Sequence, residues 1–191
     1  MNLIKKFIFL DNISELISKN ICKIKNVSII ILINPNKVNN QRKIEDFYNI
    51  ISFCKSNHLP FYVSNDYKLA VKTKAKGIYL ESSNTRVIYK NFEKTMTIIG
   101  TAHNQMEYYF KKRQNCNLIF LSPIFLTKKY SENRILGPLK FNLITNVWKT
   151  KIGCLGGLTL DNYKKINLTK AKAVGLRSLI SMAEIKNPST F

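Results

Sequence analysis

Acidic residues are scarce in this sequence. Its 191 residues include 11 Asp and Glu against 31 Lys and Arg, so the formal net charge is +20. An excess of this size is typical of a nucleic-acid partner when the basic residues gather in one patch. Here the lysines are spread along the chain, which disfavours nucleic acid as a partner. Small phosphorylated ligands would also suit such a positive field.

Histidine and cysteine are also sparse, and neither is arranged as a metal site. There are two histidines and four cysteines, and no C-x-x-C spacing occurs among His58, His103, Cys22, Cys54, Cys116 and Cys154. This spacing argues against a zinc site. It favours four buried thiols in a reducing, cytoplasmic setting.

Long apolar runs are absent as well. No stretch reaches the roughly 18 apolar residues that a membrane helix needs, and Asp11 follows Lys5 and Lys6 too soon for the apolar region of a signal peptide. We therefore expect neither a membrane partner nor a secretion signal. The length fits one domain spanning residues 1–191.

Eight short apolar, β-branched or aromatic runs predict eight β-strands. They are Phe7–Leu10, Val27–Ile33, Phe61–Val63, Gly77–Leu80, Thr97–Gly100, Leu118–Leu121, Ile152–Leu155 and Ala173–Leu176. The runs are continuously apolar, which is typical of strands covered by helices on both faces. We predict a single α/β domain, a (β/α)8 TIM-type barrel with short loops. An open doubly wound sheet is the alternative, but its glycine-rich turn is missing after the first strand.

Helical spacing predicts helices between these strands. The clearest apolar face contains Ile44, Phe47, Tyr48, Ile51 and Cys54, and a second contains Ile13, Leu16, Ile17, Ile21 and Ile24. Capping pairs three residues apart predict where two helices begin. These pairs are Asn12 with Glu15, and Asn104 with Glu107 ahead of Met106, Tyr109 and Phe110.

The ends of the last two predicted strands indicate a phosphate site. In parallel barrels the chemistry lies in the loops after the strands. Gly156 and Gly157 would let the backbone approach a ligand closely, and a helix starting near Thr159 would add N–H groups. Arg177 and Ser178 would add a cation and a hydroxyl. The alternative is that the glycine pair only makes a tight turn.

Other polar residues follow the second, third and fifth predicted strands. Asn65 and Asp66 offer hard oxygens for a divalent cation, although Asp66 is also a good helix cap. Lys37 is either a phosphate contact or a solvated lysine. His103 is a candidate general acid or base, or a hydrogen-bonding residue at a helix start, and Thr101 leaves a similar choice.

Taken in order, these segments resemble the thiamine-phosphate synthase family, which includes the TenI-like thiazole tautomerases. The resemblance spans nearly the whole chain. Ser122–Thr127, Leu136–Leu139 and Leu155–Leu158 look like the family's proline-aromatic-threonine loop, Leu-Gly turn and glycine pair. Asn65-Asp66 with Gly77–Leu80 looks like its central segment, and Ile99–His103 like its fifth-strand motif.

The resemblance implies an enzyme that joins a pyrimidine diphosphate to a thiazole phosphate, giving thiamine monophosphate and pyrophosphate with Mg²⁺. By position, Asn65 and Lys37 would hold the diphosphate and Asp66 the magnesium. The thiazole phosphate would be held by Thr127, Gly156, Gly157 and Ser178. Thr101 stands where the family often has a serine, and Lys37, Thr101 and His103 are the candidate catalytic residues. The family often forms oligomers, so a homo-oligomer is open.

The sequence departs from the family pattern on the diphosphate side. Pro35 replaces an arginine, Asn84 replaces a second magnesium aspartate, and Lys128-Lys129-Tyr130 replaces a threonine-lysine pair. These losses weaken a diphosphate site, unless Lys128, Lys129 or Arg134 compensates. The alternatives are therefore a thiazole tautomerase that uses His103, a non-catalytic phosphate-binding relative, and a basic nucleic-acid binder.

Overall fold

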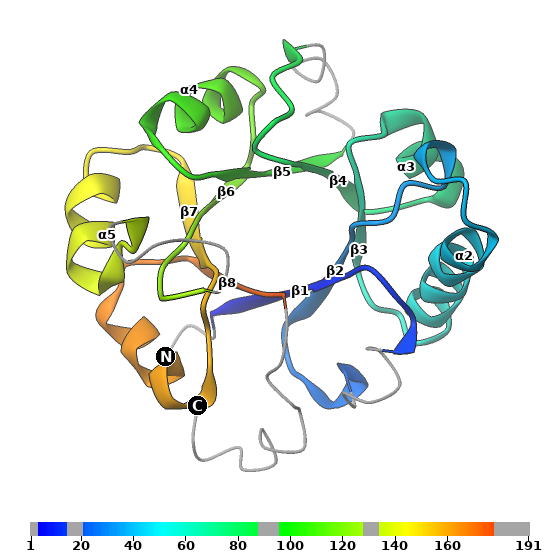
Figure 1. Ribbon diagram of the computed structural model, residues 1–191, viewed down its shortest axis with the longest axis horizontal. Coiled ribbons are helices and arrows are strands. Elements are labelled where there is room, and N and C mark those ends of the chain that lie inside the picture. The colour runs from blue at the N-terminus through cyan, green and yellow to red at the C-terminus, as the bar shows by residue number, and fades with distance from the viewer. Residues whose placement is uncertain (1–3, 15–20, 88–95, 128–133, 178–191) are drawn as a thin grey trace.

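The protein forms a closed barrel of eight parallel strands (Figure 1). The computed structural model describes residues 4–14, 21–87, 96–127 and 134–177. The strands, in chain and barrel order, are β1 (Lys5–Leu10), β2 (Val27–Ile31), β3 (Phe61–Ser64), β4 (Gly77–Leu80), β5 (Thr97–Ala102), β6 (Leu118–Leu121), β7 (Lys151–Leu155) and β8 (Ala173–Leu176). All eight predicted strands are confirmed.

Closure of the sheet rules out the open doubly wound alternative. β8 pairs in parallel with β1, for example Lys6 with Val174, which removes both sheet edges. Several strand bounds differ from the prediction by one to two residues; in particular, β2 stops at Ile31 and β5 continues to Ala102. Thr101 therefore belongs to a strand and not to the loop after it.

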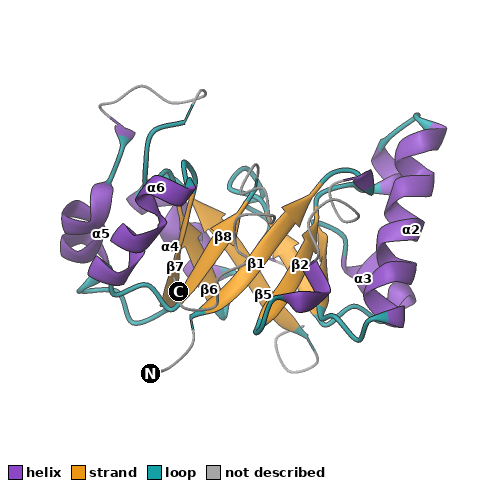
Figure 2. Cartoon of the chain, turned by 90° about the horizontal axis from the view of Figure 1, so that it is seen from below, coloured by secondary structure: helices purple, strands orange, loops and turns teal. Residues whose placement is uncertain are grey.

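Helices cover the outside of the barrel, as Figure 2 shows from the side. They are η1 (Ile21–Lys23), η2 (Pro35–Lys37), α2 (Gln41–Ser56), α3 (Tyr67–Thr73), α4 (Gln105–Arg113), α5 (Gly137–Thr145), α6 (Leu160–Tyr163) and η5 (Lys164–Leu168). The helix predicted from Ile13 to Ile24 falls partly outside the described residues, and so does Glu15 of its capping pair. In its described part, Ile21–Lys23 forms a 3-10 turn.

The predicted apolar face of α2 is mostly confirmed. Phe47, Ile51 and Cys54 are buried, whereas Tyr48 is 49% exposed. For α4 the capping pair is confirmed, because the Glu107 N–H donates to Asn104 Oδ1 at 2.9 Å.

Met106 and Tyr109, which follow this cap, do not lie on the buried face of α4. Met106 is 71% exposed and Tyr109 50% exposed, while Tyr108 and Lys111 are buried. Tyr108 stacks on Trp148, with ring centroids 3.7 Å apart and planes 6° from parallel. The choice of face follows from this tertiary partner and not from the spacing of apolar residues within the helix.

Aromatic side chains fill the inside of the barrel. Phe7, Phe9, Tyr62, Tyr79 and Phe120 are all at most 5% exposed and belong to one inner cluster. Phe9 meets Tyr79 and Phe120 edge to face, with centroids 5.3 and 5.6 Å apart. The interior is therefore packed, and a ligand site must lie at the rim.

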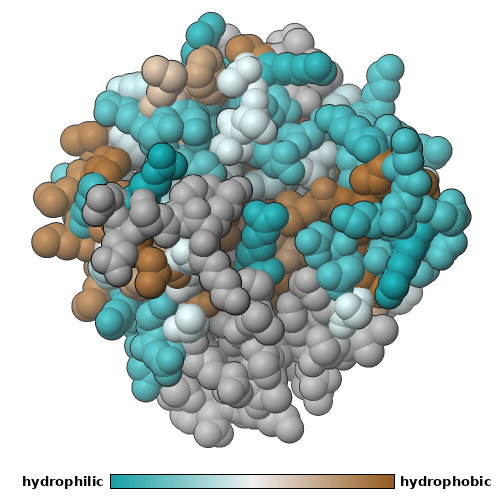
Figure 3. All heavy atoms as spheres, viewed as in Figure 1, coloured by the Kyte–Doolittle hydropathy of each residue, from teal (hydrophilic) through white to brown (hydrophobic). Residues whose placement is uncertain are grey.

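Three of the four cysteines behave as expected. Cys54, Cys116 and Cys154 are buried and Cys22 is exposed, so the prediction of four buried thiols is wrong for Cys22. No helix among the described ranges is long and apolar enough to cross a membrane. On the face shown in Figure 3, apolar side chains gather over α5, where Leu139 and Leu143 are 75% and 68% exposed.

Candidate functional site

The glycine pair after β7 has a backbone that other residues would not adopt. Gly156 and Gly157 have φ angles of +93° and +71°. A Cβ on Gly157 would lie 2.3 Å from the carbonyl oxygen of Phe125. The Phe125 N–H in turn donates to the Gly156 carbonyl at 3.2 Å. The pair is therefore packed against the loop after β6 and does more than make a turn.

The helix predicted near Thr159 begins there but is short. α6 has only four residues, and the Thr159 N–H donates to Asn162 Oδ1 at 2.9 Å. The predicted start of the helix is therefore confirmed, although a helix this short adds little dipole at an anion site. Instead, the Gly157 and Leu158 N–H groups have no hydrogen-bond acceptor among the described residues. A ligand oxygen or water would satisfy them.

Thr127 and Arg177 complete the described part of this half. The Thr127 Oγ1 is buried and has no partner among the residues that the structure describes. Arg177 directly follows β8 and is exposed. Ser178, the last residue predicted here, lies outside the described residues. We refer to Thr127, Gly156, Gly157 and Arg177 as the glycine half of the rim.

Asp66 caps α3, which was the alternative to a metal ligand. Its Oδ1 accepts from the Leu69 N–H at 2.9 Å. Its Oδ2 accepts from Asn36 Nδ2 at 3.1 Å. Capping and metal binding are compatible, because a carboxylate has about four lone pairs. The contact with Asn36 also brings the turn that carries Lys37 beside Asp66.

Asn65 has its side chain fixed by the loop after β4. Its φ is +54°, a left-handed conformation that Asn tolerates. Its Oδ1 accepts from the Glu81 N–H at 3.2 Å and from Asn84 Nδ2 at 2.9 Å. With the oxygen so occupied, the Nδ2 group, which also donates to Ser64 Oγ at 3.4 Å, is the end of the amide that would meet an anion. The pair Asn65 and Asp66, with Lys37, forms what we call the diphosphate half of the rim.

Pro35, which stands where the resemblance implies an arginine, opens the turn η2. Lys37 ends this turn and is exposed. Asn34 caps it, accepting from the Asn36 N–H at 3.0 Å. The Asn34 side chain is 8% exposed, and its Nδ2 is buried without a partner in the described part of the chain. Sequence reasoning missed Asn34; the signal was its place two residues after Leu32, whose side chain packs on the inner cluster.

Thr101 lies on the floor of the barrel mouth. It is 3% exposed, and its Oγ1 lies 2.6 Å from the Tyr79 hydroxyl. The pKa of Tyr79 is raised to about 12, mainly by burial; the hydrogen bond with Thr101 and the charge of Arg177 lower it, and the charge of Glu81 raises it. Tyr79 therefore stays protonated at neutral pH. The charges of Glu81 and Arg177 thus have opposite effects on the pKa of this buried hydroxyl.

His103 lies at the rim with a defined ring orientation. Its Nδ1 lies 3.0 Å from the Ser122 carbonyl, and its backbone N–H donates to Glu107 Oε2 at 2.7 Å. A carbonyl only accepts, so Nδ1 must carry the proton in this contact, which makes Nε2 the basic nitrogen of the neutral ring. Both predicted roles, helix-start contact and candidate acid or base, remain compatible with this geometry.

The donor set suits Mg²⁺ better than a transition metal. No group of three or more His, Cys, Asp or Glu side chains within the described ranges could hold a metal alone. Magnesium commonly uses one or two carboxylates, water and substrate phosphates. Asp66 with a bound diphosphate meets that description.

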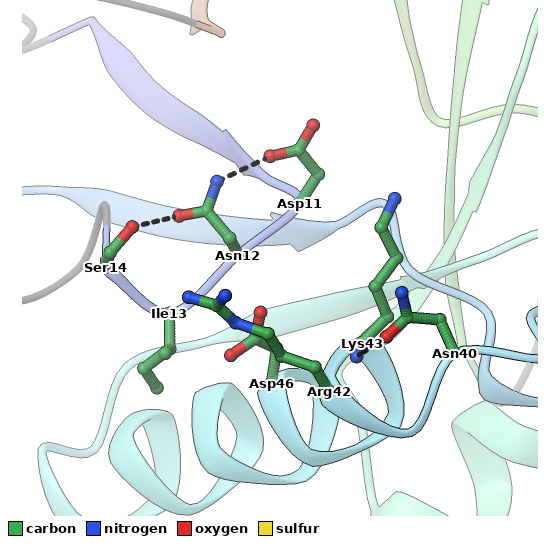
Figure 4. A pocket seen from close by; sticks show the side chains of 8 residues that line it. All are labelled: Asp11, Asn12, Ile13, Ser14, Asn40, Arg42, Lys43 and Asp46. Atoms are coloured by element: carbon green, nitrogen blue, oxygen red, sulfur yellow. Dashed lines mark hydrogen bonds between the residues drawn. The ribbon is translucent and has the colours of Figure 1, made fainter.

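A separate hollow of about 390 Å³ lies between the end of β1 and the start of α2 (Figure 4). It is lined by Asp11, Asn12, Ile13, Ser14, Asn40, Arg42, Lys43 and Asp46. None of the site residues predicted from the sequence lines it. The rim residues described above are therefore not part of this hollow.

The sequence profile of a known family matches this chain from residue 10 to residue 180, and its description is thiamine monophosphate synthase. The chain belongs to the thiamine monophosphate synthase family. The match includes every residue of both halves of the rim. The suspected resemblance is therefore confirmed.

Individual members of the thiamine monophosphate synthase family agree with this assignment. A thiamine-phosphate synthase from Staphylococcus haemolyticus is 27% identical over 152 residues, which cover 77% of this chain and 71% of that protein. One from Flavobacterium psychrophilum is 27% identical over 139 residues, covering 69% and 68%.

Solved structures show the same fold. A thiamine phosphate pyrophosphorylase from Pyrococcus furiosus superposes with a TM-score of 0.73 at 16% identity, covering 95% of this chain and 89% of that one. An aldolase from Escherichia coli superposes with a TM-score of 0.61 at 9% identity, covering 91% and 75%. At these identities the likeness concerns the barrel alone.

Proposed function

We propose that this protein is a transferase of the thiamine-phosphate synthase type. It would join hydroxymethylpyrimidine diphosphate to thiazole phosphate, giving thiamine monophosphate and pyrophosphate. The observation that carries the proposal is the glycine half of the rim. There, Gly157 has a positive φ, and the Phe125 carbonyl oxygen lies 2.3 Å from where its Cβ would be. The Gly157 and Leu158 N–H groups have no acceptor among the residues that the structure describes.

Two anionic ligands need two separate sets of hydrogen-bond donors, and the two halves of the rim would each provide one set. In the glycine half, the Gly157 and Leu158 N–H groups, Thr127 and Arg177 would hold the thiazole phosphate. In the diphosphate half, Asn65 and Lys37 would contact the diphosphate. Asn34, with its buried Nδ2, would add a donor between β2 and the turn η2.

The coupling step depends on placement and charge. The bond from the pyrimidine to pyrophosphate breaks and its electron pair leaves with pyrophosphate, while the thiazole nitrogen forms the new bond to the pyrimidine carbon. Donors already in place lower the barrier because they need no reorganisation as charge develops on the leaving group. The buried Tyr79–Thr101 pair would close the floor to water, and neither hydroxyl is needed as a base.

Magnesium, when bound, would neutralise the charge of the diphosphate. Asp66 would hold it, with the Oδ2 that faces Asn36 as the contact atom. Asn84, the residue at the position of a second magnesium aspartate, donates to Asn65 instead. One protein carboxylate would then serve where the family pattern has two, so magnesium affinity would be weaker.

Calorimetric titration with each precursor, with and without Mg²⁺, tests the proposal together with an assay for pyrophosphate release. We expect both precursors to bind, the pyrimidine diphosphate only with Mg²⁺, and pyrophosphate to appear when both are present. A folded protein that releases none contradicts the proposed reaction. Binding of thiazole phosphate alone would indicate a relative that still binds this phosphate but no longer catalyses the coupling reaction.

The orientation of His103 supports thiazole tautomerase as the second candidate function. Its Nδ1 contact with Ser122 leaves Nε2 basic, as a proton-transfer residue requires. His103→Gln would abolish tautomerase activity, whereas synthase activity would fall only modestly. Assaying both reactions with this variant separates the two functions.

Three accompanying properties belong to the same proposal. Its partners would be small phosphorylated substrates and not nucleic acid. A cytoplasmic location would suit its free cysteines. A homo-oligomer would follow the habit of the family.

A further inference from the structure

Lys111 is a fully buried lysine for which the proposed reaction has no role. It lies on α4, outside the barrel, and its side chain is 0% exposed. Its Nζ donates to the carbonyl oxygens of Glu81 at 2.5 Å and of Asn84 at 2.6 Å. Burial of an ammonium group is unfavourable unless it is well hydrogen-bonded. The hydrogen bonds to the two carbonyls explain how the buried ammonium group is tolerated. They also show that Lys111 binds the segment after β4.

Gln114 reaches the same loop from the end of α4. It is 0% exposed, and its Nε2 donates to the carbonyl oxygens of Asn84 and Arg86, both at 2.8 Å. Together the two side chains hold three carbonyls of the segment that follows β4. We call residues 81–86 the β4 loop. Without these donors, three carbonyls facing α4 would lose their partners.

Gly100 of β5 leaves space for the side chain of Lys111. A Cβ at this position would lie 2.8 Å from Cδ of Lys111 and 2.9 Å from Sγ of Cys116. The methylene chain of Lys111 therefore crosses β5 at the one residue type without a side chain. The glycine, the lysine and the β4 loop form one continuous contact from α4 to the rim.

The β4 loop passes this support on to Asn65. The two residues whose carbonyls Lys111 holds, Glu81 and Asn84, are the same two that donate to Asn65 Oδ1. An amide with two donors on its oxygen keeps its N–H groups on the opposite side. A displaced β4 loop would free this amide to rotate and would present oxygen to an anion.

We propose that Lys111, together with Gln114, is a positioning residue for the diphosphate half of the rim. Held from behind through the β4 loop, Asn65 keeps its N–H groups oriented for a diphosphate while Asp66 caps α3 next to it. Lys111 itself touches no substrate. Only the identity of the ligand rests on the proposed function; the support of Asn65 does not.

Lys111→Met tests the inference, since it keeps the length of the side chain and removes the donor. Lys112→Met is the matched control, because Lys112 is the next residue and is exposed. Hydrogen exchange reports on the loop without any ligand, through the Glu81 N–H on Asn65 Oδ1 and the Arg86 N–H on Asn84 Oδ1. We expect exchange there to accelerate by about tenfold in Lys111→Met only, as for loss of one charge-assisted hydrogen bond.

Calorimetry then measures each precursor separately. We expect Lys111→Met to weaken the pyrimidine diphosphate by about tenfold and the thiazole phosphate by less than about twofold. If Lys111→Met only disturbs the structure in general, the affinity for both precursors falls; if Lys111 has no positioning role, neither affinity changes. Either result, or unchanged exchange in the β4 loop, overturns the inference. If Lys111→Met does not fold, Gly100→Ala carries the same test by displacing the lysine.

The two proposals fail in different ways. If the wild-type protein binds no pyrimidine diphosphate, the proposed function is wrong. The exchange comparison between Lys111→Met and Lys112→Met still decides whether Lys111 positions the loop and Asn65.

Discussion

At the scale of single residues, the rim is built from conformations that few side chains tolerate. Gly157 is required twice, by a φ of +71° and by a carbonyl that occupies the place of its Cβ. Asn65 adopts a left-handed φ while its side-chain oxygen takes two donors. At Gly157 the backbone conformation orients an N–H group, and at Asn65 the two hydrogen bonds to the amide oxygen do so; these N–H groups are the ones that would contact an anion.

Gly157→Ala should lower both stability and phosphate binding. The matched control is Gly137→Ala, because Gly137 also has a positive φ of +60° but nothing within 4 Å of its Cβ position. The control should cost about 1 kcal/mol from backbone strain alone. Gly157→Ala should cost more and weaken thiazole phosphate by at least about tenfold, as urea unfolding and calorimetry would measure. Equal effects of the two variants would contradict the close packing of Gly157.

Lys111 should make stability depend on pH. Burial lowers the pKa of Lys111 from 10.5 to about 8. Between these values the folded chain has released a proton that the unfolded chain retains, so stability gains with rising pH. Compared with Lys111→Met by urea unfolding at pH 7 and 9, the wild type should gain relative stability at pH 9. A difference independent of pH would show that burial does not lower the pKa of Lys111.

At the scale of elements, one residue serves both a helix and the rim. Asp66 caps α3, a helix of seven residues, and its second oxygen faces the turn η2 through Asn36. Short helices depend on their caps because little else satisfies the first N–H groups. The same carboxylate that begins α3 is thereby held in place for a metal ion.

Two substitutions of Asp66 separate these duties. Asp66→Asn keeps a side-chain oxygen for the Leu69 N–H, so stability should change by less than about 0.5 kcal/mol. Asp66→Ala removes the cap and should cost about 1 kcal/mol. Both should lose Mg²⁺-dependent binding of the pyrimidine diphosphate, measured by calorimetry. Retained magnesium dependence in Asp66→Asn would mean that another residue holds the ion.

At the scale of the whole molecule, the charge and the barrel act together. The net charge of +20 is distributed over the chain, while the barrel gathers Lys37, Arg177 and the rim N–H groups at one end. A diffuse positive field attracts small phosphates at long range, and the rim donors provide the specific contacts.

Nucleic acid should not compete for this surface. We expect no retention of duplex DNA in filter-binding titrations at about 0.15 M salt, because spread lysines neutralise few adjacent phosphates. Thiazole phosphate affinity under the same conditions is the internal control. DNA retention that falls steeply as salt rises would instead indicate a clustered basic face.

The sequence by itself determined the barrel and the identity of its rim. Continuous apolar runs are a local property, and the eight of them located all eight strands because strands buried on both faces leave no polar alternation. Strand ends located Asn65, Thr101, His103, Gly156 and Gly157 for the same reason. The helix cap at Asp66 was also readable, since a cap needs only its own next three residues.

Only the tertiary structure decided which residues support that rim. Lys111 reads as a solvated lysine, yet closure of the barrel places Gly100 and the β4 loop against it and buries it. The inward face of α4 also depends on a distant segment, because Trp148, 40 residues from Tyr108, supplies the stacking partner. Contacts between distant segments depend on the closed sheet, and the local pattern that reveals a strand carries no information about them.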